Sequence, residues 1–341
     1  MQESVAEEHP ELFHYTNARG LVGIIQSQTL RATHYAYLND SEEMLHFHKN
    51  RLQNLLQRGA EKGLDELIAE NPGKQLIDKE KIIEGFVQTT LAGLENILWN
   101  NHDDKAPLAE PYVTSFCSTS GKDDRVKNNG LLSQWRGYGR DGGYAIVFDT
   151  ACLLQLLEKV KEKWKSDNNG NLRLEDIVYS SNDPKFHEKF EQDLIEIENF
   201  SFNRLKESLS RFKENKNYPE NLYPALMRCA CLYKHWGFEE ENEVRIVALP
   251  HPTENKEFCN HAKTNGVIFQ ELPRKHYLRS NTLIPYIDLF EGITPTSGKR
   301  LPITRIIVGP SANEQERKKR IRAVEILLNQ YSIKANVSAS E

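Results

Sequence analysis

Four glutamates lie between residues 239 and 243 and lead directly into the apolar run 244–247. Because successive side chains of a strand alternate between its two faces, we expect Glu241, Glu243 and Arg245 on one face. There Glu243 and Arg245 either form an ordinary ion pair at a solvated strand entry or together grip a ligand. This segment is therefore one candidate reactive site.

Two further polar groups lie at the edges of predicted strands, and both could hold a ligand. They comprise His14, Tyr15, Thr16, Asn39, Asp40, Ser118, Trp135 and Tyr138. Each also has a purely structural reading. His14 fits a hydrogen-bonded core histidine, and the aromatic residues fit a core or a pocket wall. Asp40 with Glu43 fits the capping box of a helix.

Several familiar sequence motifs are either absent or lie between the wrong predicted elements. Residues 137–142 match G-x-G-x-x-G, but they follow a predicted helix and open a strand, whereas a dinucleotide fold needs the reverse order. The 11 histidines show no H-E-x-x-H spacing, and His46 and His48 diverge on a helix, so no histidine-based catalytic zinc site is expected. G-x-S-x-G is absent, which leaves a hydrolase nucleophile elbow without support.

The spacing of apolar residues predicts the helices and strands that must position these residues. Helices are predicted at 18–28, from 41 to about 107 with a break at 71–73, at 131–138, over most of 151–235, and at 313–330. The loop 121–130 separates two of the motif-bearing segments. Strands are predicted at 12–16, 30–35, 112–117, 144–148, 177–179, 243–249, 266–270, 282–290, 303–308 and 332–337.

Helices and strands do not alternate regularly, which favours an α+β fold with a central mixed or antiparallel sheet. We expect one domain over residues 1–341, with helical insertions at about 41–107 and 151–235. The chain has 341 residues, 27% of them charged, and its net charge of -5 gives no general attraction to nucleic acid.

Targeting and redox features point to one compartment. No apolar run reaches the length of a membrane span, and the first residues lack the layout of a signal peptide. The five cysteines are odd in number and lack C-x-x-C spacing, so we expect reduced, mostly buried thiols. A cytoplasmic protein is the expectation.

The order of motifs resembles a bacterial family called domain of unknown function 2971. The motifs include Leu38-Asn39-Asp40 with Glu43, Gln134-Trp135-Arg136-Gly137-Tyr138, residues 143–149, residues 238–245 and residues 306–310. The resemblance runs from about Leu12 to Val337. The family name brings no established activity.

A second resemblance suggests a reaction. An opening strand with His-Tyr-Thr, a central strand ending Ser-Thr-Ser and a late strand with glutamate look like the three-part active site of ADP-ribosyltransferases, including bacterial toxins that modify DNA with NAD. The likeness implies NAD as the substrate of a toxin or defence effector. It makes Glu243, with Glu241, the catalytic carboxylate that stabilises the developing oxocarbenium charge.

The same resemblance implies the contacts to NAD. His14 or Thr16 would hold the ribose, Tyr144 or Tyr138 would stack near the nicotinamide, and Arg245 would steady the pyrophosphate. The remaining cofactor-binding positions are Tyr15, Asn39, Asp40, Ser118 and Trp135.

Two other functions stay open. A metal-dependent nuclease would use Asp40, Glu241 and Glu243 as magnesium ligands with Arg245 near the phosphate. A non-enzymatic module would merely bind a nucleotide. The basic residues between 299 and 322 are the one obvious basic concentration and would mediate any contact with nucleic acid, although a solvated helix face explains them as well.

Overall fold

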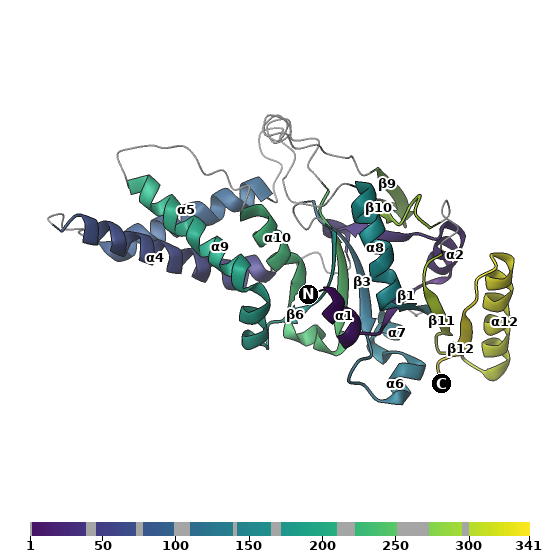
Figure 1. The fold of residues 1–341 in the computed structure, drawn as a ribbon. Coiled ribbons are helices and arrows are strands. Elements are labelled where there is room, and N and C mark those ends of the chain that lie inside the picture. The colour runs from purple at the N-terminus through teal and green to yellow at the C-terminus, as the bar shows by residue number, and fades with distance from the viewer. Residues whose placement is uncertain are drawn as a thin grey trace.

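The computed structural model describes residues 2–38, 46–72, 78–98, 110–138, 142–164, 172–209, 222–250, 273–294 and 300–341 (Figure 1). Its centre is a ten-stranded sheet, and the backbone of that sheet is the path β12-β11-β4-β1-β3-β2-β10-β9. Strand β8 pairs with β3, and β5 pairs with β8. Within this sheet the β11–β12 pairing is parallel and the other pairings are antiparallel. The predicted α+β fold with a mixed sheet is confirmed.

The strands of this sheet and of a small second one are as follows: β1 (Glu11–Thr16), β2 (Leu30–His34), β3 (Tyr112–Ser118), β4 (Tyr144–Asp149), β5 (Leu172–Asp176), β6 (Val178–Tyr179), β7 (Tyr233–Lys234), β8 (Glu243–Ala248), β9 (Arg274–Arg279), β10 (Thr282–Leu289), β11 (Ile303–Val308) and β12 (Asn336–Ala339). Strands β6 and β7 form the second sheet, and they run parallel to each other.

The large sheet forks at β3. One edge of β3 pairs with β8 along residues 112–117. The opposite edge pairs with β1 at Cys117 and Ser118 and with β2 at Tyr112 and Val113. Between these two pairings β1 and β2 diverge, so the sheet has two wings that share one strand.

Helices α2 (Ala18–Ser27), α8 (Thr150–Trp164) and α12 (Glu314–Gln330) cover one face of the sheet. The apolar face of α2, with Leu21, Ile24 and Ile25, is buried in the same cluster as Val244 and Ile246 of β8. This burial is the main force that holds the helices on the sheet.

A helical arm extends from the sheet on the other side (Figure 1). It contains η2 (His48–Leu52), α4 (Gln53–Glu70), α5 (Lys79–Leu98), α9 (Asp183–Leu209) and α10 (Leu222–Leu232). Helices α4 and α9 approach closely because α4 carries glycine where they cross. A Cβ placed on Gly59 would lie 2.2 Å from the carbonyl oxygen of Glu198. The apolar core of the arm continues onto the sheet at Val113 and Val247.

The remaining elements are short helices: α1 (Gln2–Glu8), η1 (Tyr35–Tyr37), α6 (Asp124–Asn129), α7 (Leu132–Tyr138) and η3 (Trp236–Glu241). Within the part of the chain that the structure describes, no helix is long and apolar enough to cross a membrane.

Several sequence expectations need correction. The predicted loop 121–130 contains α6, because Asp123 caps that helix by accepting from the amide of Val126. The last strand lies at 336–339 rather than 332–337. The predicted insertion 151–235 is not purely helical, since β5 within it joins the large sheet. The predicted strand 266–270 lies outside the described residues.

Candidate active site

A buried carboxylate and a buried guanidinium face each other on β8. Arg245 Nε donates to Glu243 Oε1 at 2.5 Å, and Arg245 Nη2 donates to Glu243 Oε2 at 3.0 Å. Arg245 Nη1 donates to the carbonyl oxygen of Cys231 at 3.0 Å. Glu243 is 3% exposed and Arg245 is 2% exposed. The ion pair considered from the sequence is therefore present, in the two-pronged geometry that fixes both side chains.

A buried lysine extends this pair toward the surface. Lys234 Nζ lies 2.8 Å from Glu243 Oε2 and 2.8 Å from Glu241 Oε2. Gln134 Nε2 on α7 donates to Glu241 Oε1 at 3.0 Å. The Glu241 side chain is 20% exposed, so it forms the open end of the cluster. We call the five residues Gln134, Lys234, Glu241, Glu243 and Arg245 the carboxylate network.

The local backbone brings both glutamates to the same lysine. Helix η3 starts after His235, whose Nδ1 accepts from the amide of Gly237 at 3.1 Å. Its C-cap is Asn242, whose left-handed backbone (φ 44°) turns the chain into β8. Asparagine tolerates this conformation better than most residues. The Glu243 amide then donates to Tyr179 Oη at 2.8 Å, which fixes the start of the strand.

The network holds its charge in a dry environment. Burial alone would raise the pKa of Glu243, but the charges of Arg245 and Lys234 outweigh it and lower that pKa from its usual 4.5 to about 2. Burial raises the pKa of the neighbouring Cys117 thiol well above its ordinary value, and the nearby carboxylates reinforce this. Glu243 is therefore a fixed anion, whereas Cys117 is a neutral thiol.

All four carboxylate oxygens of Glu241 and Glu243 accept a hydrogen bond. The donors are Gln134, Lys234 and Arg245. A divalent metal at these oxygens would have to lie beside the buried Lys234 ammonium or displace it, at a large electrostatic cost. The donor set thus suits an organic ligand better than magnesium.

The network lies between two apolar clusters on one face of the sheet. Val247 belongs to the core of the helical arm, and Cys117 belongs to a separate core beneath α7. In the β3–β8 register, Arg245 lies opposite Ser115 and Glu243 lies opposite Cys117. The polar segment is thus flanked by packed side chains at both ends.

Two predicted cofactor residues belong to the core beneath α7. Tyr15 and Trp135 are 6% and 5% exposed, and their rings meet edge to face with centroids 4.9 Å apart. Tyr15 Oη accepts from the amide of Leu131 at 2.7 Å, and Trp135 Nε1 donates to the carbonyl of Asn129 at 2.8 Å. These contacts hold α7, and hence Gln134, against the sheet.

His14 spans the fork of the sheet. Its Nδ1 is 3.0 Å from the carbonyl oxygen of Ser115, an arrangement that requires the Nδ1–H tautomer. Burial lowers the pKa of His14, so the ring is neutral there. The Thr114 hydroxyl donates across the same fork to the carbonyl of Arg31 at 3.0 Å.

Three other predicted cofactor residues, Thr16, Tyr138 and Tyr144, are not part of the carboxylate network. Thr16 pairs in register with Tyr144, whose ring lies 5.1 Å below the guanidinium of Arg320. Tyr138 is exposed at the end of α7. Asn39 and Asp40, together with Glu43, lie outside the described residues.

Ser118 links the network to the N-terminal segment. Its amide donates to the carbonyl of Asn242 at 3.0 Å, directly before Glu243. Its hydroxyl lies 2.9 Å from His9 Nδ1 instead of turning toward Glu241.

Several of the described basic residues between 300 and 322 have partners within the chain. Arg305 pairs with Glu11 at 2.8 Å and Arg322 with Glu325 at 3.0 Å. Arg320 donates to the carbonyl of Gly143 at 2.9 Å. Arg305 and Arg322 are therefore paired with carboxylates, whereas Arg320 is held by backbone oxygens.

Lys234 is the main functional residue that sequence reasoning missed. It follows residues 225–233, which are apolar apart from Arg228. A buried lysine there needs a carboxylate partner, but no spacing rule names that partner. Tyr179 was expected only as part of a strand. Gln134 stood in a recognised motif without an assigned role.

A charged hollow lies beside the network on the same sheet face. It is lined by Arg173, Glu175, Asp193, Arg228 and Cys231 among others. Glu175 pairs in register with Arg245, and Arg228 Nη2 donates to Glu175 Oε2 at 2.9 Å. Because Cys231 also accepts from Arg245, the hollow and the network share a wall.

No curated protein and no solved structure gives a significant match to the chain. Residues 134–246 match the family described as protein of unknown function (DUF2971). The match starts at Gln134 and ends one residue after Arg245, so it includes all five residues of the carboxylate network. Residues 134–246 are therefore similar to the DUF2971 family, which supports the resemblance carried by the motifs within this range.

Proposed function

We propose that the chain is an NAD-dependent ADP-ribosyltransferase-like enzyme whose reactive centre is the carboxylate network. The observation that supports this most directly is the Glu241 carboxylate. It reaches the surface at the open end of the network and is held from two sides, by Lys234 and Gln134. A carboxylate fixed in advance stabilises positive charge without reorganising during the reaction.

The proposed reaction breaks the bond between ribose C1′ and the nicotinamide nitrogen. The nicotinamide leaves with the electron pair, and Glu241 stabilises the oxocarbenium charge that develops on the ribose. The acceptor nucleophile then forms a bond to C1′ and loses its proton to solvent. The products are the ADP-ribosylated acceptor, nicotinamide and a proton.

Glu243 acts as a positioning residue in this scheme. Glu243 is almost fully buried, so it anchors Lys234 rather than touching the substrate. Lys234 in turn orients Glu241. In this scheme Glu241 contacts the substrate, and the buried Glu243 holds Lys234 in place.

An exposed aromatic residue on the same short helix provides a surface for a flat ring. Trp236 opens η3, which ends at Glu241, and it is 60% exposed. Nucleotide bases stack on exposed aromatic side chains with a gain of about 1–3 kcal/mol per base. Trp236 is thus our choice for contact with a base of NAD.

The nuclease alternative has less support, because a magnesium ion at these carboxylates would have to displace the buried Lys234 ammonium or lie beside it. The four cysteines among the described residues are free thiols, which fits action in a reducing compartment such as the cytoplasm.

Incubation with labelled NAD and separate DNA, RNA and protein acceptors tests the proposal, with nicotinamide release as a second readout. We expect Glu241→Gln to lower the rate at least about 100-fold, as expected when a main electrostatic contact to the transition state is removed. Glu240→Gln is the matched control, because Glu240 is an exposed carboxylate on the same short helix. Trp236→Ala should weaken NAD binding more than turnover.

Two results would overturn the proposal: no NAD binding and no nicotinamide release by the wild-type chain with any acceptor, or equal losses in Glu240→Gln and Glu241→Gln. Magnesium-dependent cleavage of nucleic acid that Glu241→Gln abolishes would favour the nuclease. Growth arrest of the expressing cell, relieved by Glu241→Gln, would identify a toxin or defence effector.

A further inference from the structure

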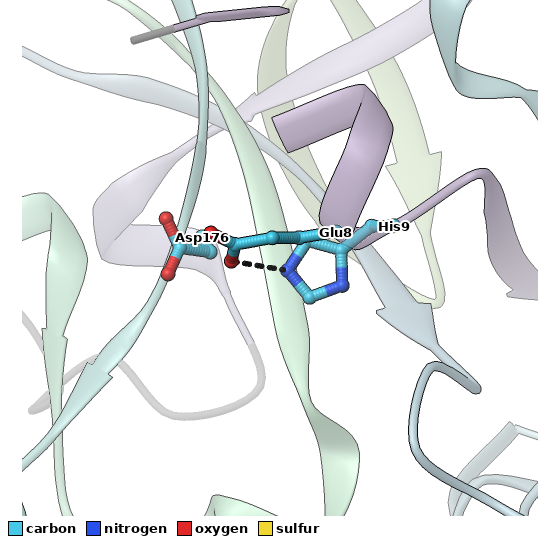
Figure 2. A group of neighbouring side chains, drawn as sticks. All are labelled: Glu8, His9 and Asp176. Atoms are coloured by element: carbon cyan, nitrogen blue, oxygen red, sulfur yellow. Dashed lines mark ion pairs between the residues drawn. The ribbon is translucent and has the colours of Figure 1, made fainter. Parts of the chain in front are cut away.

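Three potential metal ligands from distant parts of the sequence converge at one end of β5 (Figure 2). Glu8 ends α1, His9 follows it, and Asp176 ends β5. One ligand atom from each residue lies within 4.8 Å of the other two. The set offers one imidazole nitrogen and two carboxylate oxygens.

His9 carries an unsatisfied buried nitrogen that points into this group. The residue is 5% exposed, and Nε2 has no hydrogen-bond partner within the described structure. Its nearest carboxylate contact, Glu8 Oε2, is 4.0 Å away and too distant for a hydrogen bond (Figure 2). Buried polar atoms are rarely left unpaired, so this one calls for an explanation.

The opposite side of the ring explains how Nε2 could serve as a ligand. His9 Nδ1 lies 2.9 Å from the Ser118 hydroxyl, which also accepts from the amide of Ser120 at 3.1 Å. When Nδ1–H donates to Ser118, the Nε2 lone pair faces the two carboxylates. Such an outer hydrogen bond typically orients a metal-binding histidine. A lone pair facing two anions is unfavourable unless a cation lies between them.

We propose that Glu8, His9 and Asp176 bind one Zn²⁺ ion, with a remaining position open to water. One imidazole and two carboxylates are ligands that zinc accepts in four-coordinate sites. Zinc ligand atoms lie about 2.0–2.2 Å from the ion, so the group must contract somewhat on binding. Glu8 can supply that movement because its side chain is largely exposed.

The protonation states of the buried ligands agree with this geometry. Burial lowers the pKa of His9, which leaves the ring neutral as a metal requires. Burial of Asp176 would raise its pKa, but Lys189 and Lys185 outweigh it and lower the pKa to about 2.

Two lysines compete with the metal for Asp176. Lys189 Nζ lies 2.5 Å from Asp176 Oδ1, and Lys185 Nζ lies 2.8 Å from Asp176 Oδ2. Lys185 is much the more exposed of the two and can swing away, whereas Lys189 also donates to the Asp176 carbonyl at 2.6 Å. Removing the Lys185 charge should consequently strengthen zinc binding.

The site would tie the N-terminal helix to β5, whose neighbour β8 carries Glu243 and Arg245. It is independent of the proposed transferase activity, because none of its three ligands belongs to the carboxylate network.

Zinc binding by the metal-stripped full chain tests the proposal, measured by calorimetry and by competition with a chromophoric chelator. We expect one ion per chain, a loss of affinity of more than about tenfold in His9→Ala and Glu8→Gln, and a gain of about threefold or more in Lys185→Met. Because Glu8 is exposed, Glu8→Gln should fold normally even if His9→Ala does not. Circular dichroism checks folding.

Matched controls separate this site from adventitious binding. His187→Ala removes an exposed histidine elsewhere, and Cys152→Ser removes an exposed thiol; both should bind zinc as the wild type does. Zinc should also raise the melting temperature of the wild type and not that of Glu8→Gln. No binding by the wild type, or equal binding in the wild type, His9→Ala and Glu8→Gln, would reject the site.

Discussion

Glu243 accepts two hydrogen bonds from the guanidinium of Arg245, at 2.5 and 3.0 Å, from a position two residues earlier on the same buried strand. Strand alternation makes this contact possible, because it places both side chains on one sheet face. Such a pair is costly to bury, and its value depends on each charge keeping its partner.

Glu243→Gln should therefore destabilise the fold strongly. The substitution leaves Arg245 and part of the Lys234 charge uncompensated inside the protein, and removing one partner of a buried ion pair costs about 3–5 kcal/mol. Urea unfolding followed by circular dichroism measures the change. Glu240→Gln, at an exposed carboxylate, should change the free energy of unfolding by less than about 0.5 kcal/mol. Equal stability of the two variants would show that the buried pair contributes nothing.

The cost of Glu243→Gln should depend on pH. The folded-state pKa of Glu243 is about 2, below the usual 4.5, so its stabilising contribution is complete above pH 4.5 and is lost as pH falls toward 2. The protonated wild-type side chain then resembles glutamine. The stability difference between the wild type and Glu243→Gln should shrink over this range in unfolding curves collected at successive pH values. A difference that stays constant down to pH 2 would contradict the lowered pKa.

Replacing two glycines of the helical arm by alanine should change the stability of the protein in opposite directions. A Cβ at Gly59 would lie 2.2 Å from the Glu198 carbonyl oxygen, so Gly59→Ala forces α4 and α9 apart and should cost about 1–3 kcal/mol. Gly85 on α5 has nothing within 4 Å of such a Cβ, so Gly85→Ala should stabilise by about 0.5–1 kcal/mol through helix propensity. Thermal unfolding of both variants provides the measurement. A stabilised Gly59→Ala would show that the two helices are not in close contact.

The sequence patterns predicted the strands whose residues are mainly apolar. Strand β9 was not predicted because its sequence, Arg274-Lys-His-Tyr-Leu-Arg279, is mostly charged or polar. Charge on an edge strand protects against aggregation, but it also removes the apolar alternation by which a strand is recognised. Strand β5 was missed for a related reason. Its Arg173 and Glu175 face the polar side of the sheet and make ion pairs there.

The candidate site was predictable only where its residues are close in sequence. Alternation placed Glu243 and Arg245 on one face, and the structure brings Lys234 and Gln134 to them by tertiary packing. The Glu8, His9 and Asp176 group was not foreseen, because Asp176 lies far along the chain from His9 and no local spacing joins them. Tertiary contacts of this kind leave no periodic signal.

The order of strands in the sheet also constrains synthesis on the ribosome. Strand β1 emerges early but pairs with β4, and β4 in turn pairs with β11, whose other neighbour is the terminal strand β12. Strand β11 therefore has an unpaired edge until β12 has left the exit tunnel. A chain truncated before Asn336 would leave β11 as an unpaired edge open to association with other chains.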